Sequence, residues 1–111
     1  MPTMTLTVKT DENGRFQQTQ TYNPPGPFSI TVQLEVELLS PTDTVVSGEL
    51  DIDAVDGSPT NQSKKFLAEP GKRISLGSWT LDSRDNLIVV NGITVPVKAN
   101  TDLAFEMRAS L

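Results

Sequence analysis

The sequence predicts an all-β protein that folds as an antiparallel sandwich, and three observations lead to this prediction. Short runs of residues alternate between apolar and polar along most of the chain. Alternation with a period of two places the apolar side chains on one face of a strand. Gly, Pro, Asn and Asp separate these runs at short intervals, as they do in all-β domains. No segment shows the 3.6-residue apolar period of an amphipathic helix.

Length and charge narrow the range of functions. The 111 residues are expected to form a single domain, residues 1–111, with one hydrophobic core. A net charge of −5 disfavours binding to nucleic acid or to an anionic membrane. No stretch approaches the roughly 20 apolar residues of a membrane span. The N-terminus lacks the basic region and apolar core of a signal peptide. With neither a signal peptide nor a membrane span expected, the sequence leaves the localisation undetermined.

The chain contains no cysteine and no histidine. The absence of cysteine excludes disulfides, thiol catalysis and thiolate metal sites. The absence of histidine removes the usual general base at neutral pH and the usual zinc ligand. We therefore expect a protein that is not an enzyme.

Strands in the N-terminal half follow from the alternation. The residues around Met4, Leu6 and Val8 form the first expected strand, and Asn13-Gly14 predicts a tight hairpin turn after it. Residues 16–22 are mostly polar, which is typical of an edge strand. Two longer strands are expected over 28–38 and 45–55.

Five further strands are expected in the C-terminal half. A short strand over 64–68 begins a hairpin over 64–73 that turns at Pro70-Gly71, a pair that suits a type II turn. The strand over 73–81 changes phase at Gly77-Ser78, which predicts a β-bulge, and we place Trp79 in the core. Asn91-Gly92 is the strongest hairpin signal in the chain, between 87–90 and 93–97.

The last strand, 103–111, alternates up to the final residue, so it either pairs within its own chain or completes a sheet of a neighbouring copy, and we expect the first. With it the total is about nine short strands and no substantial helix. This number favours an immunoglobulin-like or a jelly-roll-like sandwich.

The distribution of charge is uneven. From Phe16 to Ser63 the chain has no lysine or arginine but has seven acidic residues. If strands 28–38 and 45–55 paired as a hairpin, Glu35 would lie opposite Glu49, and opposed like charges destabilise a sheet. Three arrangements would relieve this repulsion. The two strands lie in different sheets, basic residues from a third strand interleave, or a cation or basic partner neutralises the surface.

From these patterns we expect a structural or protein-interaction module that forms homo-oligomers. Its acidic strand face would meet the basic 64–73 segment of another copy, with edge strands contributing, and salt would weaken the association. The residues expected on the interaction face are Glu35, Glu37, Glu49, Asp51, Asp53, Lys64, Lys65, Lys72 and Arg73.

The alternative is a calcium-dependent module that binds carbohydrate or another surface ligand. Asp51, Asp53 and Asp56 offer carboxylate oxygens next to the turn residue Gly57, and such oxygens are the ligands that calcium prefers. Their spacing does not match an EF-hand loop. No other cofactor is expected.

Overall fold

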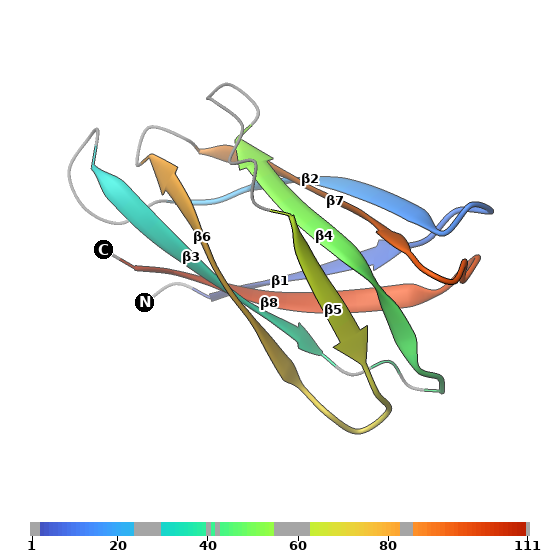
Figure 1. Ribbon diagram of the computed structural model, residues 1–111. Helices are drawn as coiled ribbons and strands as arrows, with labels where there is room; N and C mark the ends of the chain where they lie inside the picture. Colours follow the sequence, from blue (N-terminus) through green and yellow to red (C-terminus); the bar gives the residue numbers. More distant parts are fainter. Residues whose placement is uncertain are drawn as a thin grey trace.

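The computed structural model describes residues 3–23, 30–39, 41, 43–54, 63–82 and 86–110. Within these ranges the chain forms eight strands and no helix, and the predicted all-β sandwich is confirmed (Figure 1). In chain order the strands are β1 (Thr3–Lys9), β2 (Arg15–Thr21), β3 (Thr31–Leu39), β4 (Val46–Ala54), β5 (Lys64–Ala68), β6 (Ile74–Asp82), β7 (Leu87–Thr94) and β8 (Asp102–Ser110).

The strands form two antiparallel sheets of four. Sheet A has the order β1-β8-β3-β6, and sheet B has the order β2-β7-β4-β5. Strands β1 and β8, β2 and β7, β3 and β6, and β4 and β5 are neighbours, as in a long hairpin that has rolled up on itself. This is jelly-roll connectivity. An immunoglobulin-like order would have placed the first two strands in one sheet.

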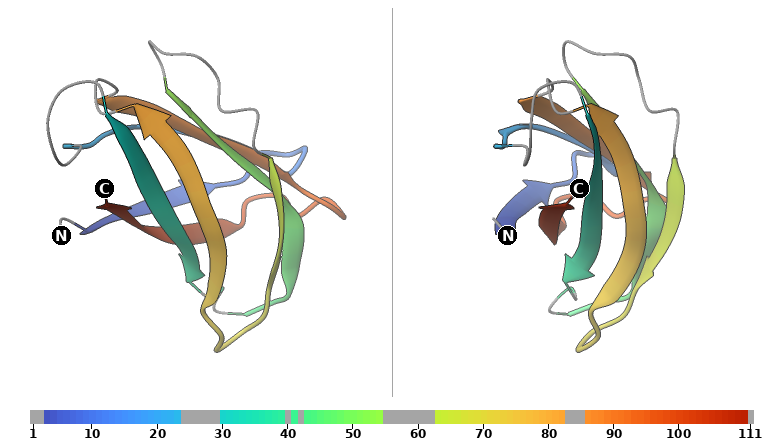
Figure 2. Two further views of the ribbon diagram at one scale, coloured as in Figure 1. Left: turned by 60° about the vertical axis from the view of Figure 1, so that its left-hand side comes forward. Right: turned by 90° about the vertical axis from the view of Figure 1, so that its left-hand side faces the viewer.

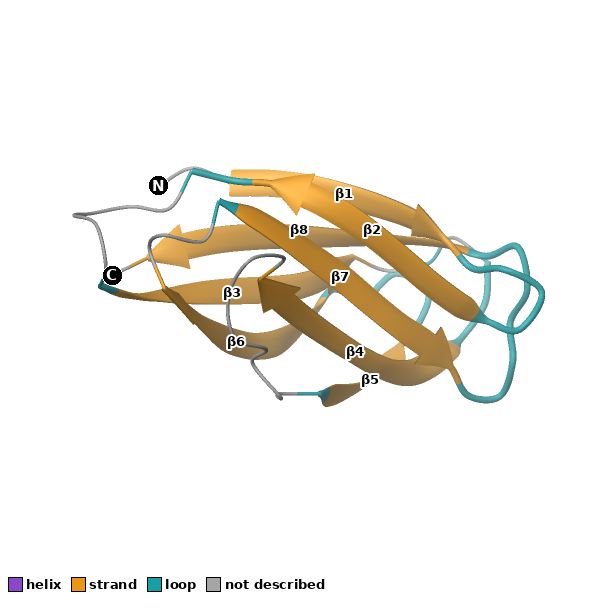
Figure 3. Ribbon diagram, turned by 90° about the horizontal axis from the view of Figure 1, so that it is seen from above, coloured by secondary structure: helices purple, strands orange, loops and turns teal. Residues whose placement is uncertain are grey.

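The two sheets face each other (Figure 2, Figure 3), and the buried apolar side chains of both form one core cluster. Alternate residues of each strand point inward, which explains why the apolar runs form strands at all. Phe16 of sheet B packs against Phe105 of sheet A with 6.0 Å between ring centroids. Trp79 is 0% exposed, so the prediction that it belongs to the core is confirmed.

The predicted hairpin at Asn91-Gly92 is wrong. Both residues lie inside a single strand, β7, which reduces the expected nine strands to eight. Gly92 lies between Phe16 on β2 and Leu50 on β4. A Cβ atom at Gly92 would lie 2.3 Å from the Glu49 carbonyl oxygen and 2.5 Å from the Phe16 ring. The glycine therefore provides room for close packing.

Two other turns form as predicted, but they connect strands in different sheets. Asp11 Oδ1 accepts hydrogen bonds from the backbone N–H groups of Asn13 and Arg15, and Gly14 has a φ of +75°. Gly71 has a φ of +78° in the turn before β6. Since β1 pairs with β8 and β5 pairs with β4, neither turn closes a hairpin, and the predicted 64–73 hairpin is wrong.

Three smaller predictions are confirmed. The register between β3 and β6 shifts at Val36/Glu37, and Gly77 has a φ of +85°, which is the predicted bulge. The polar strand β2 lies at an edge of sheet B. Strand β8 pairs with β1 on one side and β3 on the other, so its apolar residues are covered within the chain.

Candidate functional site

The two acidic strands lie in different sheets, which is the first of the three arrangements that relieve the repulsion. Glu35 is on β3 in sheet A, and Glu49 is on β4 in sheet B. Their neighbours Leu34 and Leu50 are fully buried in the core. Because side chains alternate along a strand, the two carboxylates point to opposite outer surfaces of the sandwich. The acidic residues of β3 and β4 therefore divide between the outer surfaces of the two sheets.

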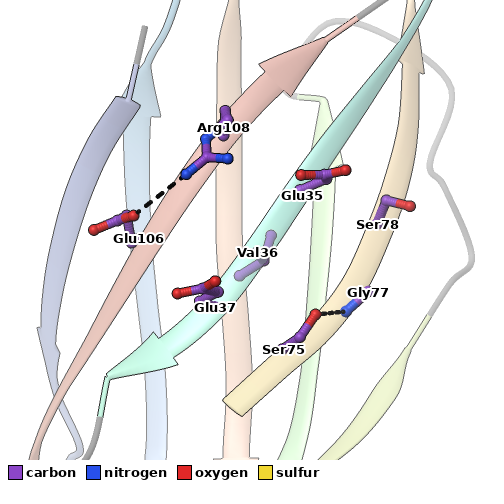
Figure 4. A pocket seen from close by; sticks show the side chains of 8 residues that line it. All are labelled: Glu35, Val36, Glu37, Ser75, Gly77, Ser78, Glu106 and Arg108. Atoms are coloured by element: carbon purple, nitrogen blue, oxygen red, sulfur yellow. Dashed lines mark hydrogen bonds and ion pairs between the residues drawn. The ribbon is translucent and has the colours of Figure 1, made fainter. Parts of the chain in front are cut away.

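The outer surface of sheet A has a shallow depression of about 220 Å³ (Figure 4). Gly77 contributes no side chain there, and the neighbouring serines are short, while longer charged side chains stand around them. The residues that line it are Glu35, Val36, Glu37, Ser75, Gly77, Ser78, Glu106 and Arg108.

Ion pairs connect the charges beside this depression. Arg73 Nη2 lies 2.6 Å from Glu37 Oε2 and 3.2 Å from Glu106 Oε2. The hydrogen bonds that Arg73 donates to the Glu37 carboxylate are the main reason that the pKa of Arg73 is raised, and Glu106 adds to the effect. Arg108 lies opposite Glu35 in the register of β3 and β8. Basic residues of β8 and of the turn before β6 thus lie among the acids of sheet A.

On the outer surface of sheet B, the predicted acidic residues Glu49, Asp51 and Asp53 all lie on one strand, β4. Glu49 has Lys65 opposite it on β5 and Ile93 opposite it on β7. Asp51 and Asp53 follow along β4, and both are half-buried. This surface combines acidic, basic and aliphatic side chains.

The remaining two predicted interaction residues lie apart from both faces. Lys64 Nζ lies 5.0 Å from the centroid of the Trp79 ring, at the edge where β5 and β6 meet. Lys72 is in the β5–β6 turn, with its Nζ 3.4 Å from Glu69 Oε2. The structure therefore does not bring the nine predicted residues together into one surface.

The sequence did not reveal a cluster of exposed aliphatic residues at one corner of sheet B. Among the described residues, the exposed large hydrophobics are Val45 (49% exposed), Leu67 (51%), Val95 (59%) and Val97 (57%). Val45 precedes Ser47 by two residues, while Leu67 and Val95 lie beside Ser47, and we call these three residues the apolar corner. Leu67 lies opposite Ser47 on one side, and on the other side the Val95 N–H donates to the Ser47 carbonyl oxygen (2.8 Å). Leu67 and Val95 thus flank the same residue.

Two buried threonines hold the segment that carries Val95 of this corner and the exposed Val97. Thr94 Oγ1 donates to the Gly14 carbonyl oxygen (3.3 Å) and accepts from the Lys98 N–H (2.8 Å). Thr10 Oγ1 accepts from the Thr101 N–H at 2.9 Å. Both threonines are almost completely buried. Residues 95–101 are therefore tied to the β1–β2 turn at both ends.

The calcium alternative keeps the status of a prediction. Asp51 and Asp53 lie on β4, and Asp56 lies outside the described residues. Over the described ranges, no three or more acidic residues are grouped so that they could hold a metal ion. Melting curves recorded with saturating calcium and with a chelator test the prediction, because a ligand that binds the folded state raises the melting temperature.

Comparison with known proteins returned no matching family model, no matching curated protein and no matching solved structure. Among the described residues, no helix is long and apolar enough to cross a membrane.

Proposed function

We propose that this protein is a non-catalytic interaction module that self-associates through the apolar corner of sheet B. The observation that carries the proposal is that Leu67 and Val95 lie on either side of Ser47 and Val45 precedes it by two residues, with each aliphatic side chain about half exposed. Clustered exposed apolar residues mark interaction surfaces, whereas single ones carry no such meaning.

The fixed position of the corner supports the same proposal. Thr94 and Thr10 hold the chain that presents Val95 and Val97. A surface that is already ordered loses little conformational entropy when it binds, so more of the contact energy appears as affinity. Because hydrogen bonds already order this segment, its exposed valines are suited to binding a partner protein.

The charges around the corner favour a second copy as the partner. Glu49 and Lys65 lie side by side next to Leu67, and Lys98 follows Val97. In a two-fold dimer each patch meets a copy of itself, so a surface that carries both signs of charge can satisfy both partners. This route replaces the expected one, in which a wholly acidic face meets a basic segment.

Sedimentation equilibrium over a range of protein and salt concentrations tests the proposal. We expect a dimer that persists at high salt, because salt screens charges but does not weaken apolar contacts. Leu67→Lys should shift the equilibrium to monomer by at least tenfold in the dissociation constant. Thr5→Lys makes the same charge change on the outer face of sheet A and should associate like the wild type. A wild-type monomer at all concentrations, or equal association of Leu67→Lys, would refute the proposal.

A further inference from the structure

Lys64 occupies an unusual position at one edge of the sandwich. Strand β5 ends sheet B and β6 ends sheet A, and the two strands contact each other along this edge. Strand alternation places Lys64 on the same side of β5 as Phe66 and Ala68, which are both buried. An ammonium group therefore stands on the core side of an edge strand.

The surroundings of the ammonium group explain how the fold accommodates it. Lys64 Nζ lies 5.0 Å from the centroid of the fully buried Trp79 ring, a distance at which a cation is attracted to the ring face. A Cβ atom at Gly77 would approach Lys64 Nζ to 3.0 Å, so the glycine of the bulge leaves room for it. The aliphatic stem of a lysine can cover apolar surface while its charge stays near water.

We propose that Lys64 keeps the free edge of β5 from pairing with the β5 strand of a second copy. Among the described strands, β5 has β4 as its only sheet neighbour, so its other side offers a row of backbone groups. An antiparallel copy of β5 would continue sheet B and enclose both Lys64 ammonium groups between apolar layers. Burying a charge without a close partner is strongly unfavourable. Charged residues that point inward on edge strands are a known defence against such pairing.

The proposal concerns the edge of sheet B and is independent of the apolar corner on its face. If it holds, the expected association through edge strands is disfavoured at β5. The adjoining edge strand β6 carries the Gly77 bulge, and bulges disrupt pairing as well.

The experiment replaces Lys64 by an apolar side chain of similar length. Lys64→Met is compared with Lys65→Met, which removes the same charge from the outward side of the same strand. Lys64→Arg keeps the charge and the contact with Trp79. All variants carry Val95→Lys as well, so that association through the apolar corner does not contribute.

We expect Lys64→Met to associate at least tenfold more strongly than Lys65→Met and Lys64→Arg in sedimentation, with slower amide exchange across residues 64–68. Lys64→Gln provides a second neutral variant in case the methionine variant folds poorly, and a cooperative melting curve establishes the folded state. Equal association of all folded variants would overturn the proposal. Association of Lys64→Met without slower exchange in β5 would also overturn it, because the contact would then lie elsewhere.

Discussion

Glu37 and Glu106 lie directly opposite each other on β3 and β8, and Arg73 binds both carboxylates. Like charges opposed in a sheet are destabilising unless a third group compensates. The guanidinium can do so because one nitrogen lies within 3.2 Å of an oxygen from each glutamate. Two acidic residues do lie opposite each other, as the sequence suggested. The pair is Glu37 and Glu106 within sheet A, however, and not Glu35 and Glu49.

Replacing Arg73 by Gln should lower the melting temperature by several degrees, because two opposed carboxylates lose their shared counter-ion. Thermal unfolding followed by circular dichroism measures the effect. The double variant Arg73→Gln/Glu106→Gln should recover most of the loss, since a single carboxylate remains. Lys9→Gln removes an exposed lysine 4.0 Å from Asp102 and should have little effect. If the losses of melting temperature caused by Arg73→Gln and Glu106→Gln simply added in the double variant, this interpretation would be contradicted.

Gly92→Ala should destabilise the protein by about 3 kcal/mol, as expected for overpacking against a rigid neighbour. The added methyl group would meet the Glu49 carbonyl oxygen, which belongs to the β4 backbone and cannot move alone. Denaturant titration gives the free energy of unfolding. Gly71→Ala is the control, because no atom lies within 4 Å of a Cβ there. The control should cost about 1 kcal/mol, from its positive φ. A smaller cost for Gly92→Ala than for Gly71→Ala would contradict the packing role.

Thr94→Val should cost about 1–3 kcal/mol, since it leaves the Lys98 N–H without its buried acceptor. The same substitution should speed amide exchange at Lys98 and weaken self-association, because residues 95–101 lose one of their attachments. Thr7→Val, on the exposed face of β1, should change stability by less than about 0.5 kcal/mol. Unchanged exchange at Lys98 would show that Thr94 does not hold this segment.

Local patterns predicted individual strands well. The expected strand over 64–68 matches β5, and the polar strand after Asn13-Gly14 is β2. Even the bulge at Gly77 was visible as a change of phase. These features depend on neighbours in the sequence, and alternation reports directly on which face of a strand is buried.

Features that depend on neighbours in space escaped prediction. Asn91-Gly92 has the composition of a hairpin turn, but Gly92 serves the packing of Phe16 and the β4 backbone. The apolar corner combines Leu67 with Val95, which become near neighbours because each lies beside Ser47 of the strand between them. Residues so far apart in sequence cannot be associated from local periodicity.

The sequence alone determined the all-β class, most strand positions and the conflict between acidic strands, because each follows from alternation and composition. Tertiary structure decided where the acids of β3 and β4 lie, since only the strand order separates Glu35 from Glu49. It also decided that Glu37 and Glu106 share Arg73, and that Lys64 covers Trp79 instead of joining an exposed basic patch. The physical reason is that cross-strand register brings together residues from distant parts of the chain, and charge compensation depends on distance in space.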